Sequence, residues 1–247
     1  MISFIPGGVN IGSFIPTGCP PIDNLLGGGI ECGIVTQVYG EPGSGKTNLC
    51  LQAAVECSKS GKKVIYIDTE GLSLDRFSQI AGSRSKEIAQ NILIYEPMSF
   101  DEQYTAIYEI EKILGENVGL IVVDSATSFY RYELDDDSSS IQSRRELSNQ
   151  IGFLQGMARK SGVSVLITNQ VFSDVGAHPE FSRNSGRNGY AGNAVRPLGG
   201  KAIEHISKTI IQLERTGAGT RAAKIVKHRC RPEGEKCEFK ITSDGLR

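Results

Sequence analysis

The chain has 247 residues and a formal net charge of −1. That length suffices for one α/β domain with a sizeable core, and the balanced charge excludes the overall basic field of a general polyanion binder. The longest apolar runs are only strand-length, and the N-terminus lacks the basic-then-apolar layout of a secretory signal, so we expect a cytoplasmic protein without a membrane span. Six scattered cysteines without a CxxC pair are expected to be reduced thiols.

Apolar strand-like runs alternate with helical patterns along most of the chain. Strands are expected at 34–39, 63–68, 91–95, 119–124 and 163–168, and helices at 48–58, 73–81, 99–114, 143–161 and 201–206. Residues 209–214 and 221–227 flank the glycine-containing run 216–220, which is typical of a hairpin, and a last strand is expected at 238–242. Residues 130–142 and 171–200 are expected to be irregular. This order predicts a mostly parallel sheet flanked by helices, with an antiparallel C-terminal extension.

Residues 40–47 (GEPGSGKT) fit the phosphate-loop pattern G-x-x-x-x-G-K-[ST] between an expected strand and an expected helix. Glycines let the backbone turn tightly, so that successive N–H groups point at a phosphate chain, and the helix N-terminus adds its dipole. Lys46 is expected to reach the β- and γ-phosphates, and the Thr47 hydroxyl to bind Mg²⁺. We therefore predict that a nucleoside triphosphate with magnesium is held by Gly40, Glu41, Pro42, Gly43, Ser44, Gly45, Lys46, Thr47 and Asn48.

Three polar residues stand at the ends of later strands, and strand ends in such sheets converge on one crevice. Asp124 is expected to hold Mg²⁺ through water, the alternative being a helix cap or turn former. Because Ser125 follows it, the carboxylate that polarises the attacking water must come from elsewhere, and Glu70 is the candidate, against a solvated loop acid. Gln170 is expected to sense the γ-phosphate, against a plain polar strand end. Lys46, Glu70 and Gln170 are thus the expected catalytic set.

The segment 171–200 begins directly after Gln170 and is rich in glycine, asparagine, serine and arginine. Basic, flexible loops can follow a phosphate backbone. We therefore expect nucleic-acid contacts, as opposed to ordinary solvated charge on a loop, from Arg183, Arg187, Arg196 and Lys201.

In combination these motifs resemble the RecA-like recombinases, most closely an archaeal branch of paralogues. Residues 16–30 (PTGCPPIDNLLGGGI) are similar to that family's entry to the core, and 66–71 (YIDTEG) to its catalytic-glutamate strand. Residues 168–171 (TNQV) and 196–201 (RPLGGK) resemble the borders of its second DNA-binding loop. The resemblance implies a RecA-like phosphate-loop ATPase core that binds ATP, Mg²⁺ and DNA and is active between stacked subunits, hence a possible homo-oligomer.

The chain also departs from full recombinases. Residues 1–15 form only a short lead, so we expect a single domain over 1–247 without an N-terminal helical domain, and no Phe-x-x-Ala tether precedes the core. Lys227 and Arg229 stand where an Asp-Ser-Pro cap is usual. Their spacing resembles KaiC-like ATPases, in which a strand donates cations across a subunit interface, and the alternative is a basic exposed strand. Arg76 matches a family position that packs on adenine, against a surface salt bridge.

The function implied is that of a recombinase paralogue in homologous recombination and DNA repair. It is expected to act as an accessory or mediator, with weak Mg²⁺-dependent ATPase activity and no strand exchange alone. The implied partners are single-stranded or branched DNA, a RadA-type recombinase and a junction resolvase. The alternatives are a KaiC-like signalling ATPase without DNA binding, a small-molecule kinase and a non-catalytic adaptor.

Overall fold

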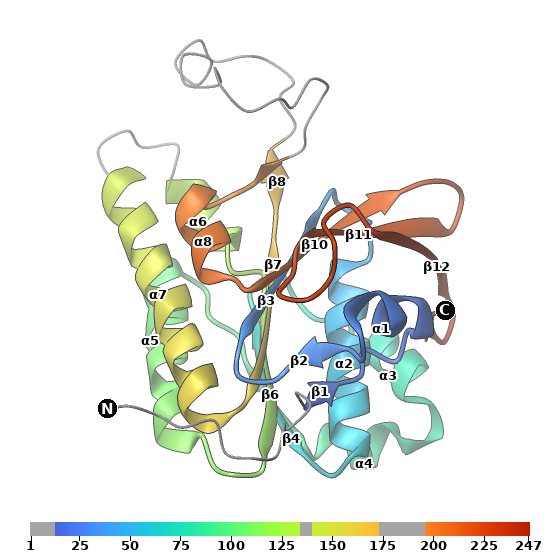
Figure 1. The fold of residues 1–247 in the computed structure, drawn as a ribbon. Coiled ribbons are helices and arrows are strands. Elements are labelled where there is room, and N and C mark those ends of the chain that lie inside the picture. Colours follow the sequence, from blue (N-terminus) through green and yellow to red (C-terminus); the bar gives the residue numbers. More distant parts are fainter. Residues whose placement is uncertain (1–12, 134–139, 173–195) are drawn as a thin grey trace, which may run out of the picture.

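The computed structural model describes residues 13–133, 140–172 and 196–247. Its centre is a nine-stranded sheet with the spatial order β13-β12-β11-β10-β3-β7-β6-β4-β5 (Figure 1). The strands are β3 (Val35–Gly40), β4 (Lys63–Asp68), β5 (Ile92–Tyr95), β6 (Val118–Asp124), β7 (Ser164–Asn169), β10 (Thr209–Arg215), β11 (Thr220–Lys227), β12 (Lys236–Thr242) and β13 (Gly245–Leu246).

The sheet has two parts that differ in strand direction. From β10 to β5 every neighbouring pair is parallel, whereas β10, β11, β12 and β13 pair antiparallel in succession. The structure thus confirms the predicted fold class, a parallel core with an antiparallel C-terminal extension. Two small sheets lie outside it, formed by β1 (Phe14–Ile15) with β2 (Ile30–Glu31) and by β8 (Val171–Phe172) with β9 (Arg196–Pro197).

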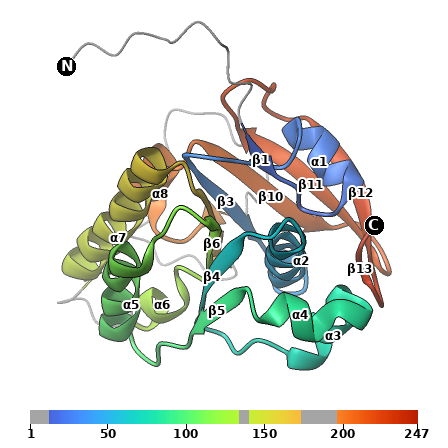
Figure 2. The same cartoon turned by 90° about the horizontal axis from the view of Figure 1, so that it is seen from below.

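Helices cover both faces of the sheet. Figure 2 shows the helices α1 to α4 on one face of the sheet and the helices α5 to α8 on the opposite face. The first group is α1 (Pro20–Leu26), α2 (Lys46–Lys59), α3 (Leu74–Ala81), a 3₁₀ turn (Gly82–Arg84) and α4 (Ser85–Ala89). The second group is α5 (Phe100–Ile113), α6 (Ser128–Glu133), α7 (Ser140–Ser161) and α8 (Gly200–Ile206).

The central strands bury side chains on both faces, which is why they are apolar throughout. In β6, Leu120 and Val122 belong to the core beneath α2, while Ile121 and Val123 belong to the core beneath α5 and α7. A period-2 strand buried on both sides requires such a continuous apolar run. The two cores hold the sheet in place, so the residues at its carboxyl edge are set on a rigid support.

The predicted elements agree with the structure to within a few residues, with exceptions at the irregular regions. Residues 130–142 were expected to lack regular structure, and this was wrong at both ends, because α6 runs to Glu133 and α7 begins at Ser140. Within 171–200, the short β8–β9 pair was also missed. The helix α1 was missed because two consecutive prolines open it, a pattern that a turn shares.

The described residues bear on two predictions about the whole chain, the state of its cysteines and the presence of a membrane span. The six cysteines are all unpaired, as expected, and Cys50 and Cys57 are buried on α2. Over the same ranges, no helix combines the length and the apolar character that a membrane crossing needs.

Candidate nucleotide-binding site

The sequence-predicted site residues meet at the carboxyl edge of the parallel strands. The phosphate loop follows β3, Glu70 follows β4, Asp124 ends β6 and Gln170 follows β7. Because these four strands are neighbours in the order β3-β7-β6-β4, the side chains are brought to one stretch of the edge. The common location was predicted because all four residues stand at strand ends. In the structure, β7 lies between β3 and β6, which brings Gln170 next to the phosphate loop and Asp124.

The phosphate loop takes backbone conformations that favour glycine. Gly43 and Gly45 have φ values of +74° and +105°, and a Cβ on Gly40 would lie 2.2 Å from the Leu213 carbonyl oxygen of β10. The Lys46 ammonium donates to the Gly40 and Glu41 carbonyl oxygens at 2.9 and 3.2 Å. Burial lowers the pKa of Lys46, while the carboxylates of Glu70 and Asp124 oppose that shift. The loop therefore folds around its own lysine at the start of α2.

Asp124 is 3% exposed and lies within a ring of hydroxyl groups. Thr168 donates to Oδ1 at 2.5 Å and Tyr66 to Oδ2 at 3.0 Å, and the Thr47 hydroxyl also bonds to this carboxylate. Burial raises the pKa of Asp124 despite these three bonds. A buried carboxylate without a paired cation is costly, so this site is suited to gaining a positive charge.

Glu70 and Gln170 contact one another directly. The Gln170 side-chain amide donates to Glu70 Oε1 at 2.7 Å across 100 positions of sequence. The turn that carries Glu70 is fixed by Asp68, whose carboxylate accepts the backbone N–H groups of Glu70, Gly71 and Leu72 at 3.2, 3.0 and 2.5 Å. This role of Asp68 escaped sequence reasoning, although an aspartate before a glycine-containing turn is the available signal.

Gln170 also connects the edge of the sheet to the segment that follows it. Its N–H donates to the Thr127 hydroxyl at 3.0 Å, and its carbonyl oxygen accepts the N–H of Leu198 at 3.0 Å. The neighbouring Asn169 donates to the Leu198 carbonyl oxygen at 3.0 Å. The residues just before α8 are therefore held by Asn169, the last residue of β7, and by Gln170, which follows it.

The residues present fit a magnesium–triphosphate complex. Buried oxygens without a protein partner remain on Ser125 (Oγ) and Gln170 (Oε1), beside the carboxylates. Magnesium binds through one or two carboxylate or hydroxyl ligands and completes its shell with phosphate and water oxygens. Thr47 and Asp124, which are already in contact, supply that set. The glycine loop and Lys46 supply the anion-binding part.

Comparisons with known proteins agree with this geometry. The family model described as Rad51 matches residues 13–247. A protein of Methanococcoides burtonii named DNA repair and recombination protein RadB is 62% identical over 93% of this chain and 95% of its own. Its namesake in Archaeoglobus fulgidus is 47% identical over 94% of this chain and 97% of its own.

A solved structure described as a crystal structure of the RadB recombinase superposes with a TM-score of 0.75 at 35% identity, covering 94% of this chain and 98% of that one. The chain belongs to the RadB branch of the Rad51 family. It is therefore a RecA-like recombinase paralogue, as the motifs at its strand ends and at the phosphate loop predicted.

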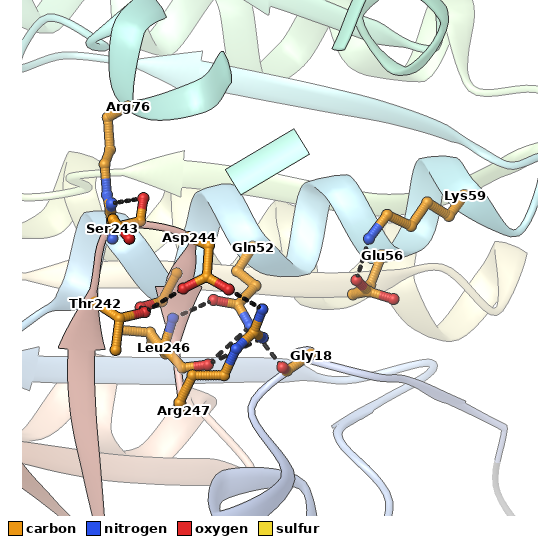
Figure 3. A network of polar contacts seen from close by, with 11 residues as sticks. Gly18, Gln52, Glu56, Lys59, Arg76, Thr242, Ser243, Asp244, Leu246 and Arg247 are labelled. Atoms are coloured by element: carbon orange, nitrogen blue, oxygen red, sulfur yellow. Dashed lines mark hydrogen bonds and ion pairs between the residues drawn. The ribbon is translucent and has the colours of Figure 1, made fainter. Parts of the chain in front are cut away.

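In this RadB-family chain, Arg76 of α3 faces the first turn of α2 (Figure 3). Its guanidinium donates to Asn48 at 2.5 Å, to Gln79 at 2.9 Å and to the Ser243 carbonyl oxygen at 2.9 Å, and its Nη2 atom is buried without a partner. These partners are all uncharged. Arg76 thus links Asn48, a predicted nucleotide-binding residue, to the turn between β12 and β13. The contact of Arg76 with adenine stays a prediction.

The C-terminus is fastened to the helix that follows the phosphate loop. Gln52 is 2% exposed, accepts the N–H of Leu246 at 2.6 Å and donates to the carbonyl oxygens of Leu246 and Gly18 at 3.2 and 2.5 Å (Figure 3). One buried amide therefore joins α2, β13 and the segment before α1. No pattern in the sequence indicated this contact.

The two cations predicted to act across a subunit interface have partners within the chain. The Lys227 ammonium donates to the carbonyl oxygens of Glu204, His205 and Ser207 at 2.8, 3.4 and 2.8 Å, at the end of α8. Arg229 pairs with Glu31 at 2.5 Å. Their action on a neighbouring subunit stays a prediction, and the structure assigns Lys227 a contact that the sequence did not indicate.

The predicted DNA contacts divide between described and undescribed parts of the chain. Arg196 on β9 and Lys201 in the first turn of α8 are exposed, next to the residues that Gln170 and Asn169 hold. Arg183 and Arg187 lie outside the described residues. The two described cations are thus at the edge of the sheet that carries the nucleotide-site residues.

Proposed function

We propose that this chain is an ATP-binding and DNA-binding recombinase paralogue that assists homologous recombination and DNA repair. It hydrolyses ATP weakly with magnesium and does not carry out strand exchange alone. The observation that supports this most directly is the 2.7 Å hydrogen bond between Gln170 and Glu70. It joins the carboxylate expected to polarise water to the residue from which the DNA-binding segment begins.

With nucleotide bound, Lys46 would turn from the Gly40 and Glu41 carbonyl oxygens to the β- and γ-phosphates. Thr47 would bind a magnesium ion directly and Asp124 would hold it through water, and the ion would supply positive charge to the phosphate oxygens. Arg76, which bonds to Asn48, would pack on the adenine. Glu70 positions and deprotonates the attacking water, a step that needs its carboxylate ionised.

Gln170 couples the presence of the γ-phosphate to the affinity for DNA. A phosphate near Glu70 competes for the Gln170 amide, which has a buried oxygen without a partner and one bond to Glu70. The backbone carbonyl oxygen of Gln170 accepts the Leu198 N–H, so a side-chain displacement that shifts the Gln170 backbone would move Leu198, and with it Arg196 and Lys201. ATP would thereby alter DNA affinity through the backbone of Gln170, with Arg183 and Arg187 as further contacts to DNA.

The accessory role follows from the charge available to the reaction. Phosphoryl transfer in RecA-type sites draws cations from a neighbouring subunit. Lys227 is engaged by three carbonyl oxygens and Arg229 by Glu31 within one chain, so turnover is slow unless a neighbour displaces them. A RadA-type recombinase and a junction resolvase are the proposed partners, in the cytoplasm.

The test is nucleotide-dependent DNA binding. Fluorescence anisotropy with single-stranded DNA, over a range of salt concentrations, compares the wild type with Gln170→Ala in the presence and absence of Mg-ATP. We expect ATP to change the wild-type affinity about tenfold, a steep salt dependence from phosphate contacts, and loss of the ATP effect in Gln170→Ala. The exposed Gln90→Ala is the matched control.

Two outcomes contradict the proposal. An ATP effect that persists in Gln170→Ala removes the hydrogen-bonded connection between the two sites. No salt-dependent DNA affinity in any nucleotide state favours the KaiC-like signalling alternative.

A further inference from the structure

Arg221, which sequence reasoning did not select, contacts the phosphate loop from the antiparallel extension. It stands at the start of β11, and its Nε–H donates to the carbonyl oxygen of Gly43 at 2.9 Å. The contact spans 178 positions of sequence. The bond therefore joins Arg221, which belongs to no sequence motif, to the tip of the phosphate loop.

The same guanidinium is anchored on the β10–β11 turn. Its Nη1 donates to the carbonyl oxygens of Gly217 and Thr220 at 3.2 and 2.8 Å. The turn is itself held, because Thr216 N–H donates to Thr220 at 3.3 Å and Ile241 N–H to Gly219 at 3.1 Å. Arg221 therefore has a fixed base, and its Nε–H reaches out from it to the loop.

Within the phosphate loop, the tip is held by the Ser44 N–H, which donates to the Glu41 carbonyl oxygen at 3.1 Å. Gly43 is exposed with φ +74°, and a Cβ added there would meet nothing within 4 Å. The base of the loop is different, since Gly40 is packed against Leu213 and Gly45 lies near Ile241. The Arg221 bond thus links the exposed tip of the loop to the sheet.

A carbonyl oxygen repels phosphate, whereas the N–H groups of the loop attract it. The bond to Arg221 turns the Gly43 carbonyl toward a cation, which keeps this oxygen out of the anion site. A guanidinium suits the task because it is always charged and offers several donors in a planar fork. A lysine has the charge but cannot bond Gly43 and the β10–β11 turn in the same fixed geometry.

We propose that Arg221 is a positioning residue of the nucleotide site, which holds the phosphate loop open for the triphosphate by a tether to the β10–β11 turn. This inference rests on the proposed ATP binding. It predicts that nucleotide affinity depends on an arginine outside the phosphate-loop motif and on its fork geometry, not on positive charge alone.

The experiment is calorimetric titration of the full chain with Mg-ADP and with Mg-AMP-PNP, a non-hydrolysable ATP analogue. We expect Arg221→Ala to weaken both affinities about tenfold, the effect of one lost charge-assisted hydrogen bond. Arg221→Lys should remain nearly as weak. Arg215→Ala is the matched control, because Arg215 pairs with Arg221 across the hairpin, is exposed and carries the same charge. It should bind as the wild type does.

Thermal unfolding without nucleotide separates positioning from folding, because a positioning role leaves the melting temperature within a few degrees. If Arg221→Ala does not fold, Arg221→Lys carries the test. Wild-type affinity in either variant overturns the inference. If the wild type and Lys46→Ala both fail to bind nucleotide, the proposed function falls, and this inference falls with it.

Discussion

The parallel part of the sheet and its antiparallel extension contribute to the candidate site in different ways. In the parallel part, Lys46, Glu70, Asp124 and Gln170 each follow or end a strand, and local motifs indicate all four. In the extension, Arg221 and Lys227 contact backbone carbonyl oxygens of segments far from them or of a helix end. The first group is expected to bind and hydrolyse nucleotide, and the second to hold the surrounding backbone in place. Substitutions in the two parts should therefore differ in kind as well as in size.

The largest expected effect is at Lys46. We expect Lys46→Ala to weaken Mg-ATP binding more than about a hundredfold, because it removes the one cation within the phosphate loop. Calorimetry measures the loss. Lys59→Ala, on the last turn of the same helix, is the control and should bind normally. Unchanged affinity in Lys46→Ala would mean that the loop is not the phosphate site.

A change at Glu70 should separate binding from turnover. Glu70→Gln keeps the size of the side chain and removes its basicity, so we expect nucleotide affinity to be unchanged and the ATP hydrolysis rate to fall about a hundredfold. Steady-state phosphate release gives the rate, with the exposed Glu116→Gln as the control. Normal turnover in the Glu70 variant would remove this residue from the mechanism.

Asp124 should show a conflict between stability and metal binding. Burial raises the pKa of Asp124, so the folded protein binds its proton more tightly than the unfolded chain, and stability falls as pH rises from the unfolded value through the folded one. Without nucleotide at pH 7, we expect Asp124→Asn to melt about 3 °C higher than the wild type. The same variant should lose the magnesium dependence of ATP binding.

Asp244 offers a control of opposite sign. Hydrogen bonds from Thr242 and Arg247 lower the pKa of Asp244 to about 2, so its contribution to stability is present above the unfolded value and is lost as pH falls toward 2. Melting curves of Asp124→Asn and Asp244→Asn against the wild type, from about pH 3 to about pH 8, cover ordinary carboxyl titration and should show opposite pH dependences. A pH dependence of the same sign for both would contradict this account of Asp124.

The smallest expected effect is at Lys227. Its ammonium caps the end of α8, and a cation at a helix C-terminus contributes about 0.3–1 kcal/mol. We expect Lys227→Ala to lower the melting temperature by about 2 °C. Lys224→Ala, on the same strand, is the control. If Lys227→Ala kept the wild-type melting temperature but lowered ATP hydrolysis in mixtures with wild-type subunits, this would favour action of Lys227 across a subunit interface.

Sequence reasoning was most successful where function depends on contiguous residues. The helix expected at 99–114 runs from Phe100 to Ile113, and the structure shows Ser99 as its cap, since the Ser99 hydroxyl accepts the Glu102 N–H at 3.1 Å. The hairpin between β10 and β11 was predicted from its glycine-rich turn. Short-range rules of propensity, capping and alternation suffice in these cases. They failed at α1 and α6, which are short helices that owe their stability to packing.

By itself, the sequence determined the phosphate loop, the order of strands and helices, and which residues stand at strand ends, because each depends on neighbours within a few positions. Only the tertiary structure decided that Gln170 bonds to Glu70, that Gln52 holds the C-terminus and that Arg221 supports Gly43. Such contacts join residues between 100 and 194 positions apart. A side chain with several donors has many possible partners along a chain, and the strand order and packing select one of them.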